Sequence, residues 1–133
     1  MSKKYNEPDS LTDVAKFHDT FGAPILDIPT IPAQDRCDLR VSLIQEELNE
    51  LKEAIVDNDM VEVADALGDM LYILCGTIIE HGMQHKIEAV FEEIQRSNMS
   101  KLGDDGQPIY REDGKVLKGP HYFKPNIQEI LES

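Results

Sequence analysis

Two successive segments that combine apolar periodicity with clustered acids constrain this chain more than any other feature. Each carries three acidic residues: Glu46, Glu47 and Glu50 in the first, and Glu62, Asp65 and Asp69 in the second. On a helix, the first three fall within roughly 100° of one another and the second three within roughly 60°. Apolar residues fill the adjoining helical positions, among them Leu43, Leu48, Val63, Leu67 and Leu71. The acids therefore border an apolar core, and the pattern predicts two long amphipathic helices.

Facing carboxylates need a counter-charge. Two like charges 4 Å apart near a protein surface repel each other by about 4 kcal/mol. Oxygen ligands of this kind suit a hard divalent ion, so we expect Mg²⁺, with Mn²⁺ as an alternative. The competing interpretation is a solvated acidic face, with Asp59 and Glu62 forming a capping box at the start of the second helix.

The order of the acidic motifs resembles that of the all-α nucleoside triphosphate pyrophosphohydrolases. This superfamily includes MazG, the dimeric dUTPases and phosphoribosyl-ATP pyrophosphohydrolase. Glu46-Glu47-x-x-Glu50 is followed after 11 residues by Glu62-x-x-Asp65, which leads into an apolar helix. Aligning the pattern on Asp69 instead leaves open whether Glu62 or Asp69 shares the metal with Asp65. The resemblance extends over roughly residues 10–125.

The resemblance implies an all-α, four-helix MazG-like bundle and a Mg²⁺-dependent enzyme. The reaction would convert a nucleoside triphosphate, either ribo- or deoxy-, to the monophosphate and diphosphate, in nucleotide-pool control or house-cleaning. The expected metal ligands are Glu47, Glu50, Glu62, Asp65 and Asp69. Glu46 or Glu47 would act on the attacking water. The resemblance also implies a homodimer or homotetramer.

Two other functions stay open. The first is phosphoribosyl-ATP pyrophosphohydrolase of histidine synthesis, although the long glycine-rich tail of this chain departs from that enzyme's compact form. The second is a non-catalytic, metal-binding helical dimer.

The length, net charge and cysteine content of the chain limit the classes of partner and location that we expect. A chain of 133 residues is large enough for one domain with a buried core. Its net charge of −13 argues against binding to a nucleic acid or an anionic membrane. Cys37 and Cys75 lack CxxC spacing and are expected to be reduced thiols. With no apolar leader and no apolar run long enough to span a bilayer, the expected location is cytoplasmic.

The spacing of apolar residues, together with helix-capping and helix-breaking residues, predicts four main helices, over about residues 10–21, 35–57, 60–81 and 84–97. Ser10 with Asp13 marks the first helix start, and Gly22 its end. The third helix is apolar on too many faces for one neighbour, which favours burial against a second subunit. The single domain would thus comprise core helices over about 10–98 and a glycine-rich extension over 99–133. Within that extension, Asp113-Gly114 predicts a small β-hairpin, followed by a short final helix.

The remaining candidate residues would bind substrate. Six of the 13 Lys and Arg residues lie in the last 38 positions, although the chain is acidic. Arg96, Asn98 and Lys101 follow the fourth helix in a run that resembles the corresponding MazG segment, and a triphosphate needs such donors. The alternative is an ordinary polar helix end. We also expect contacts from Lys118 and Tyr122. His18 and Phe21 could hydrogen-bond and stack on a base, although Phe17 and Phe21 also fit a core face.

Overall fold

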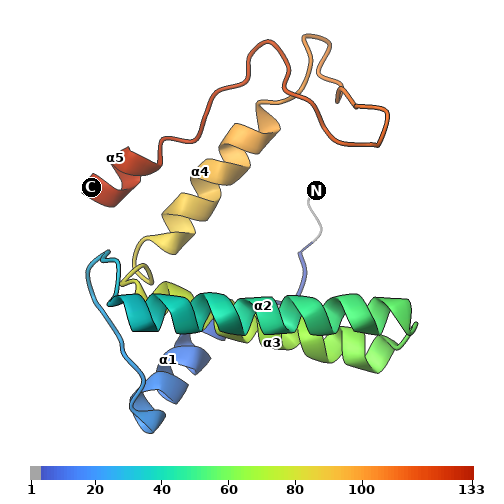
Figure 1. Ribbon diagram of the computed structural model, residues 1–133. Coiled ribbons are helices and arrows are strands. Elements are labelled where there is room, and N and C mark those ends of the chain that lie inside the picture. The colour runs from blue at the N-terminus through green and yellow to red at the C-terminus, as the bar shows by residue number, and fades with distance from the viewer. Residues whose placement is uncertain (1–3) are drawn as a thin grey trace. The chain divides into compact units, whose positions relative to one another are not determined.

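The computed structural model describes residues 4–133, which form five helices and, within that range, no β-strand. The helices are α1 (Ser10–Phe21), α2 (Gln34–Val56), α3 (Met60–Glu80), α4 (Ile87–Met99) and α5 (Ile127–Glu132), as Figure 1 shows. The prediction of an all-α chain is confirmed, and each predicted helix is present within a few residues of its predicted bounds. The chain divides after Gln84 into two compact units, and the single-domain organisation stays a prediction.

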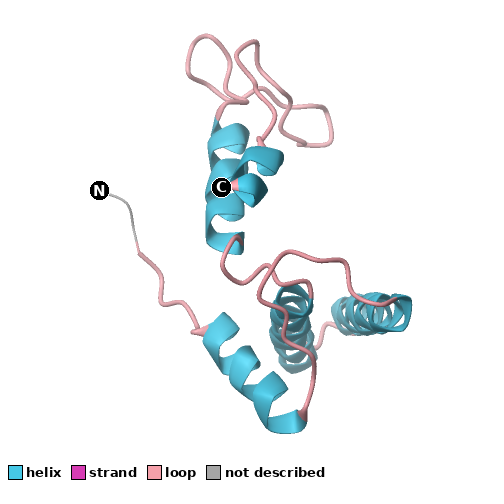
Figure 2. Cartoon of the chain, turned by 90° about the vertical axis from the view of Figure 1, so that its left-hand side faces the viewer, coloured by secondary structure: helices cyan, strands magenta, loops and turns pink. Residues whose placement is uncertain are grey.

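In the first unit, α2 and α3 lie side by side as a helical hairpin, seen nearly end-on in Figure 2. The turn between them contains Asn58 at a φ of 53°, a left-handed conformation that asparagine tolerates well. The Asp59 side chain then caps α3 by accepting a hydrogen bond from the Glu62 backbone N–H at 3.2 Å. This reversal brings the two acidic segments onto facing helices.

Helix α1 packs on the C-terminal half of α3 and supplies the main apolar core. Val14 contacts Cys75 and Ile79, and all three are buried. Gly22 ends the helix at a φ of 74°, as predicted. The predicted start at Ser10 is confirmed, but no side-chain hydrogen bond from the described residues caps the helix. Both predicted thiols are free, with Cys37 half-buried.

The prediction that Phe17 and Phe21 belong to the core is also wrong. Their side chains are 43% and 70% exposed, and the two rings lie against each other with centroids 4.4 Å apart. They are four residues apart on a helix that has one buried stripe, and Val14 and His18 occupy that stripe instead.

In the second unit, α4 contacts α5, and Ser97 anchors the following loop by donating from Oγ to the Phe123 carbonyl at 2.8 Å. The predicted β-hairpin is wrong. Tyr110 and Val116 form a single antiparallel bridge around the turn at Gly114, and no strand extends from it within residues 4–133. Both side chains are exposed, and a two-stranded hairpin without a covered face is marginal in water. Among the described residues, no helix combines the length and apolar character needed to cross a bilayer.

Candidate active site

An acidic cavity lies between the C-terminal half of α2 and the N-terminal half of α3. Its volume is about 310 Å³, and six of its seven lining residues are acidic: Glu50, Glu53, Ala54, Asp57, Asp59, Glu62 and Asp65. One member of the first predicted cluster therefore shares a cavity with two members of the second. Glu46 is exposed on α2 and is not among the lining residues.

Four carboxylates on the facing helices interact electrostatically, and we call Glu47, Glu50, Asp65 and Asp69 the carboxylate cluster. Burial raises the pKa of Glu47 to about 7, helped by a hydrogen bond with Glu50 and by the negative charges of Glu50, Asp69 and Asp65. Burial also raises the pKa of Asp69, with Asp65 and Glu50 adding to the effect. Two of the acids therefore resist ionisation when no cation is present.

One oxygen of this cluster lacks any protein partner. Glu47 Oε2 is buried and makes no hydrogen bond. A buried carboxylate oxygen without a partner is costly, so it favours either a proton or a cation. Among residues 4–133, no three potential ligands are already arranged to hold an ion. The donors are nevertheless hard oxygens on two facing helices, which fits Mg²⁺ or Mn²⁺.

Glu62 combines the two roles that its sequence context suggested. Its backbone N–H is bonded to Asp59, whereas its carboxylate lines the acidic cavity. Only half of the capping box is thus formed in the described structure, and the side chain stays available to a ligand.

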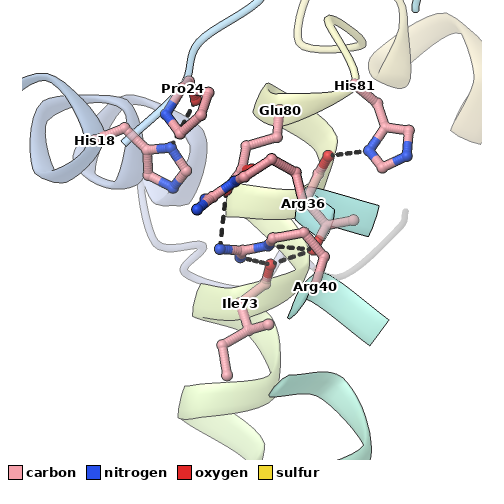
Figure 3. Close-up of polar contacts among 8 residues, drawn as sticks. His18, Pro24, Arg36, Arg40, Ile73, Glu80 and His81 are labelled. Carbon is pink, nitrogen blue, oxygen red and sulfur yellow. Dashed lines mark hydrogen bonds and ion pairs between the residues drawn. The ribbon is translucent and has the colours of Figure 1, made fainter. Parts of the chain in front are cut away.

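A buried charge network at the other end of the hairpin escaped the sequence analysis. Glu80 is 1% exposed and accepts hydrogen bonds from Arg36 Nε and Nη2, each at 2.9 Å, and pairs with Arg40 Nη1 at 3.0 Å (Figure 3). Arg40 also donates from Nη2 to the Ile73 carbonyl at 2.7 Å and from Nε to Thr77 Oγ1 at 3.1 Å. Burial lowers the pKa of Arg40, whereas the hydrogen bond with Glu80 raises the pKa of Arg36.

Gly76 makes room for this network. A Cβ at this position would come within 2.5 Å of Arg40 Nη2 and 2.8 Å of His18 Nε2. The i and i+4 spacing of the two arginines shows only that they share a helix face, and nothing local in the sequence ties them to a glutamate about 40 positions later.

His18 and Phe21, the predicted base contacts, lie in contrasting surroundings. His18 is 3% exposed, and its Nδ1 lies 2.9 Å from the Pro24 carbonyl oxygen (Figure 3). Phe21 is exposed. Base binding by either residue stays a prediction.

The other predicted substrate contacts lie in the second unit. Arg96 is held by Glu93, with Nε 2.8 Å from Oε1, and its guanidinium lies 4.3 Å from the Phe123 ring centroid. Asn98 is exposed. Lys101, in contrast, is half-buried, and its ammonium group has no partner within the described structure.

A backbone hydrogen bond joins the two predicted substrate-binding segments of this unit. The Gly119 N–H donates to the Lys101 carbonyl at 2.8 Å. Next to Gly119, the Lys118 ammonium lies 4.9 Å from the Tyr122 ring centroid. The structure thus brings Lys101, Lys118 and Tyr122 into one group of loops.

Comparison with known proteins gives three findings. The family model described as phosphoribosyl-ATP pyrophosphohydrolase matches residues 14–98, a range that contains the whole carboxylate cluster. An uncharacterized protein of Acanthamoeba polyphaga mimivirus is 32% identical over 93 residues, which is 67% of this chain but only 37% of that protein. The solved structure of a candidate NTP pyrophosphohydrolase from Exiguobacterium sp. 255-15 is 31% identical and covers 96% of this chain and 94% of its own. Its TM-score against this chain is 0.47.

Proposed function

The chain belongs to the phosphoribosyl-ATP pyrophosphohydrolase family, and on this basis we propose that it hydrolyses the α–β phosphoanhydride of a nucleoside triphosphate. The products would be the nucleoside monophosphate and pyrophosphate. The family match confirms the superfamily predicted from the acidic motifs. The observation that carries the proposal is the carboxylate cluster, in which burial and the charges of neighbouring acids on α2 and α3 raise the pKa of Glu47 and of Asp69.

The cluster supports a Mg²⁺ or Mn²⁺ site. We propose Glu50, Asp65 and Asp69 as ligands, joined by Glu47 and Glu62. When bound, the ion would neutralise phosphate charge and lower the pKa of a coordinated water. The protein's own contribution is to hold the acids on two rigid helices, so that little rearrangement is needed when substrate binds.

A carboxylate of this cluster would also orient the attacking water and accept its proton. Glu46 and Glu47 are the two candidates from the sequence. Glu47 is the better supported, because its buried Oε2 has no protein partner, whereas Glu46 is exposed. The proton would pass from the water to a Glu47 carboxylate oxygen as the water oxygen bonds to phosphorus at the α–β linkage and the bridging P–O bond breaks.

Phosphate binding requires cationic donors that are not already committed. Arg36 and Arg40, the arginines of the first unit, are engaged by Glu80. Among the donors named from the sequence, we propose Lys101 as the foremost, because its ammonium group has no partner within the described residues. Arg96 would first have to leave Glu93. Asn98, Lys118 and Tyr122 would complete the contacts.

A simple ribo- or deoxynucleoside triphosphate is the proposed substrate. Phosphoribosyl-ATP, which also carries a triphosphate chain, is the second candidate because the matching family model bears its name. The family match ends at residue 98, so the glycine-rich extension lies outside it and favours the first candidate. Both substrates would undergo the same chemistry.

A homodimer or homotetramer also fits the surface of the first unit. Helix α3 exposes several large apolar side chains, including Val61, Leu67, Leu71 and Leu74. Helix α2 likewise exposes Val41, Leu48, Ile55 and Val56. Apolar surface on this scale typically marks an interface. Sedimentation equilibrium at micromolar concentration should detect the oligomer, and a monomer would refute it.

The decisive experiment is an assay of pyrophosphate release from ribo- and deoxynucleoside triphosphates and phosphoribosyl-ATP, each with and without Mg²⁺. Asp65→Asn should abolish release, because it removes a charge from the cluster. Asp38→Asn, on the exposed side of α2, is the matched control and should behave as wild type. If no nucleotide yields pyrophosphate, the proposed reaction is refuted and the non-catalytic helical dimer gains support.

A further inference from the structure

Gly68 occupies the middle of α3 without a structural reason that the chain itself supplies. Glycine is among the poorest helix-forming residues, and its φ here is not in the left-handed region. A Cβ at this position would meet no atom within 4 Å. Gly76 on the same helix differs, because Arg40 and His18 fill the space beside it. No contact among the described residues therefore requires glycine at position 68.

The open space beside Gly68 belongs to a groove of about 270 Å³ between α1 and α3. Its lining residues come from the start of α1 and the middle of α3: Pro8, Ser10, Asp13, Val14, Gly68, Leu71 and Tyr72. We call it the Gly68 groove. Its walls are mainly apolar, and Ser10 and Asp13 add a hydroxyl and a carboxylate. Pockets for drug-sized ligands measure about 300–1,000 Å³, so this groove suits a smaller group.

An aromatic ring lies at the groove and contacts a second ring on α1. Tyr72 meets Phe17 edge-on, with ring centroids 5.7 Å apart and planes at 87°. Tyr72 is 42% exposed, so part of its side chain stays accessible. An accessible aromatic ring beside an open glycine backbone is suited to a flat ligand.

The groove adjoins the carboxylate cluster along one face of α3. Asp65, Gly68, Asp69 and Tyr72 follow the spacing i, i+3, i+4 and i+7, which places them on the same side of the helix. A ligand that reaches from Asp65 and Asp69 toward α1 would therefore enter the groove over Gly68.

We propose that the Gly68 groove binds the nucleobase of the nucleotide whose phosphates lie at the carboxylate cluster. This inference rests on the proposed function. The base would lie against the Gly68 backbone and the Tyr72 ring, where stacking is available to any base. The Asp13 carboxylate only accepts hydrogen bonds, so it favours a base with an amino group on the facing edge, such as cytosine over uracil. A second copy of the chain is the competing occupant, but it would not require acceptors at the rim of the groove.

Gly68→Ala tests the inference, because a methyl group would project into the groove where the base is proposed to lie, while improving helix propensity. We expect the thermal midpoint to stay equal or rise, and KM for the best nucleotide to increase about tenfold or more. Inorganic triphosphate, which has no base, should inhibit the variant and the wild type with equal Ki. Ser42→Ala, exposed on α2, also raises helix propensity and should leave every value unchanged.

Three results would overturn the proposal. An unchanged nucleotide KM in Gly68→Ala would show that no base enters the groove. An equal rise in the Ki of inorganic triphosphate would show damage to the phosphate site instead. A changed dimer dissociation constant with unchanged KM would assign the groove to a second copy. If the wild type cleaves no nucleotide, the proposed reaction fails, but the groove can still be tested by binding. Equilibrium dialysis then compares wild type with Gly68→Ala, and the variant should bind the nucleotide more weakly but inorganic triphosphate equally well.

Asp13→Asn tests whether the Asp13 carboxylate accepts a hydrogen bond from an amino group of the base. An amide both donates and accepts, so the ratio of kcat/KM for cytosine over uracil nucleotides should fall severalfold. An unchanged ratio would contradict the assignment of Asp13.

Discussion

The Arg40 guanidinium and the Glu80 carboxylate form an ion pair in the interior of the α2–α3 hairpin, with Nη1 3.0 Å from Oε2. Arg40 and Ala54 are the buried residues that α2 contributes. Because Arg40 also bonds to the Ile73 carbonyl and the Thr77 hydroxyl, it fixes α2 lengthwise against α3. Glu47 and Asp69 face each other only when α2 and α3 keep this lengthwise alignment.

Arg40→Met should therefore destabilise the protein strongly. It leaves the Ile73 carbonyl without its guanidinium donor and removes one of the two cations on Glu80, and breaking a buried pair typically costs about 3–5 kcal/mol. Arg36 stays bonded to Glu80, so we expect about 3 kcal/mol in urea unfolding. Arg111→Met, which breaks an exposed pair with Asp113, is the control and should leave the urea midpoint close to that of the wild type. A similar loss in both variants would contradict the role given to Arg40.

Glu47 makes the stability of the metal-free protein depend on pH. Its pKa rises from 4.5 to about 7 on folding, so the folded state binds more protons than the unfolded state between these values. Stability should fall as pH rises from about 5 to 8. Glu47→Gln removes this slope and, after solvent screening is allowed for, should add about 1 kcal/mol at pH 8, or about 3–5 °C.

Thermal melts of wild type and Glu47→Gln with a chelator present, taken from pH 4 to pH 8, measure this effect. The two proteins should converge toward the acid end and separate as the pH rises. Glu92→Gln, an exposed change on α4, should follow the wild type throughout. A wild-type stability that rises over the same range would contradict the account of Glu47.

Asp69→Asn should separate metal binding from folding. The pKa of Asp69 is raised by burial and by Asp65 and Glu50, so its charge opposes folding when no ion is bound. The metal-free variant should be at least as stable as wild type. Mn²⁺ at 100 times its dissociation constant should stabilise the wild type by about 2.7 kcal/mol. The variant should lose most of that gain together with its turnover, and an undiminished gain would remove Asp69 from the ligand set.

Sequence periodicity was sufficient for the helices and for the facing acids, because both depend on local spacing. The Arg40–Glu80 pair was not predictable, because its partners lie on different helices and no local pattern links them. Phe17 and Phe21 were misplaced because apolar spacing reports a shared face and does not say whether a neighbour covers it. Asp113-Gly114 correctly predicted a chain reversal, but strand pairing also needs a covered face, which the exposed Tyr110 and Val116 lack. The groove beside Gly68 was not predictable either, because it depends on how α1 packs against α3.

Lys101→Ala should weaken nucleotide binding more than Arg96→Ala does. Lys101 has no competing partner within the described residues, whereas Arg96 is bound at both ends of the Glu93 carboxylate. A charge-assisted contact to phosphate contributes about 1.5–3 kcal/mol, so losing it should raise KM by roughly ten- to a hundredfold. Turnover should change less, because the contact is present in the ground state and the transition state alike. Steady-state kinetics with the best nucleotide measure both values, and Lys124→Ala, exposed beside Phe123, serves as the control. A normal KM for Lys101→Ala would mean that this segment is only a helix end.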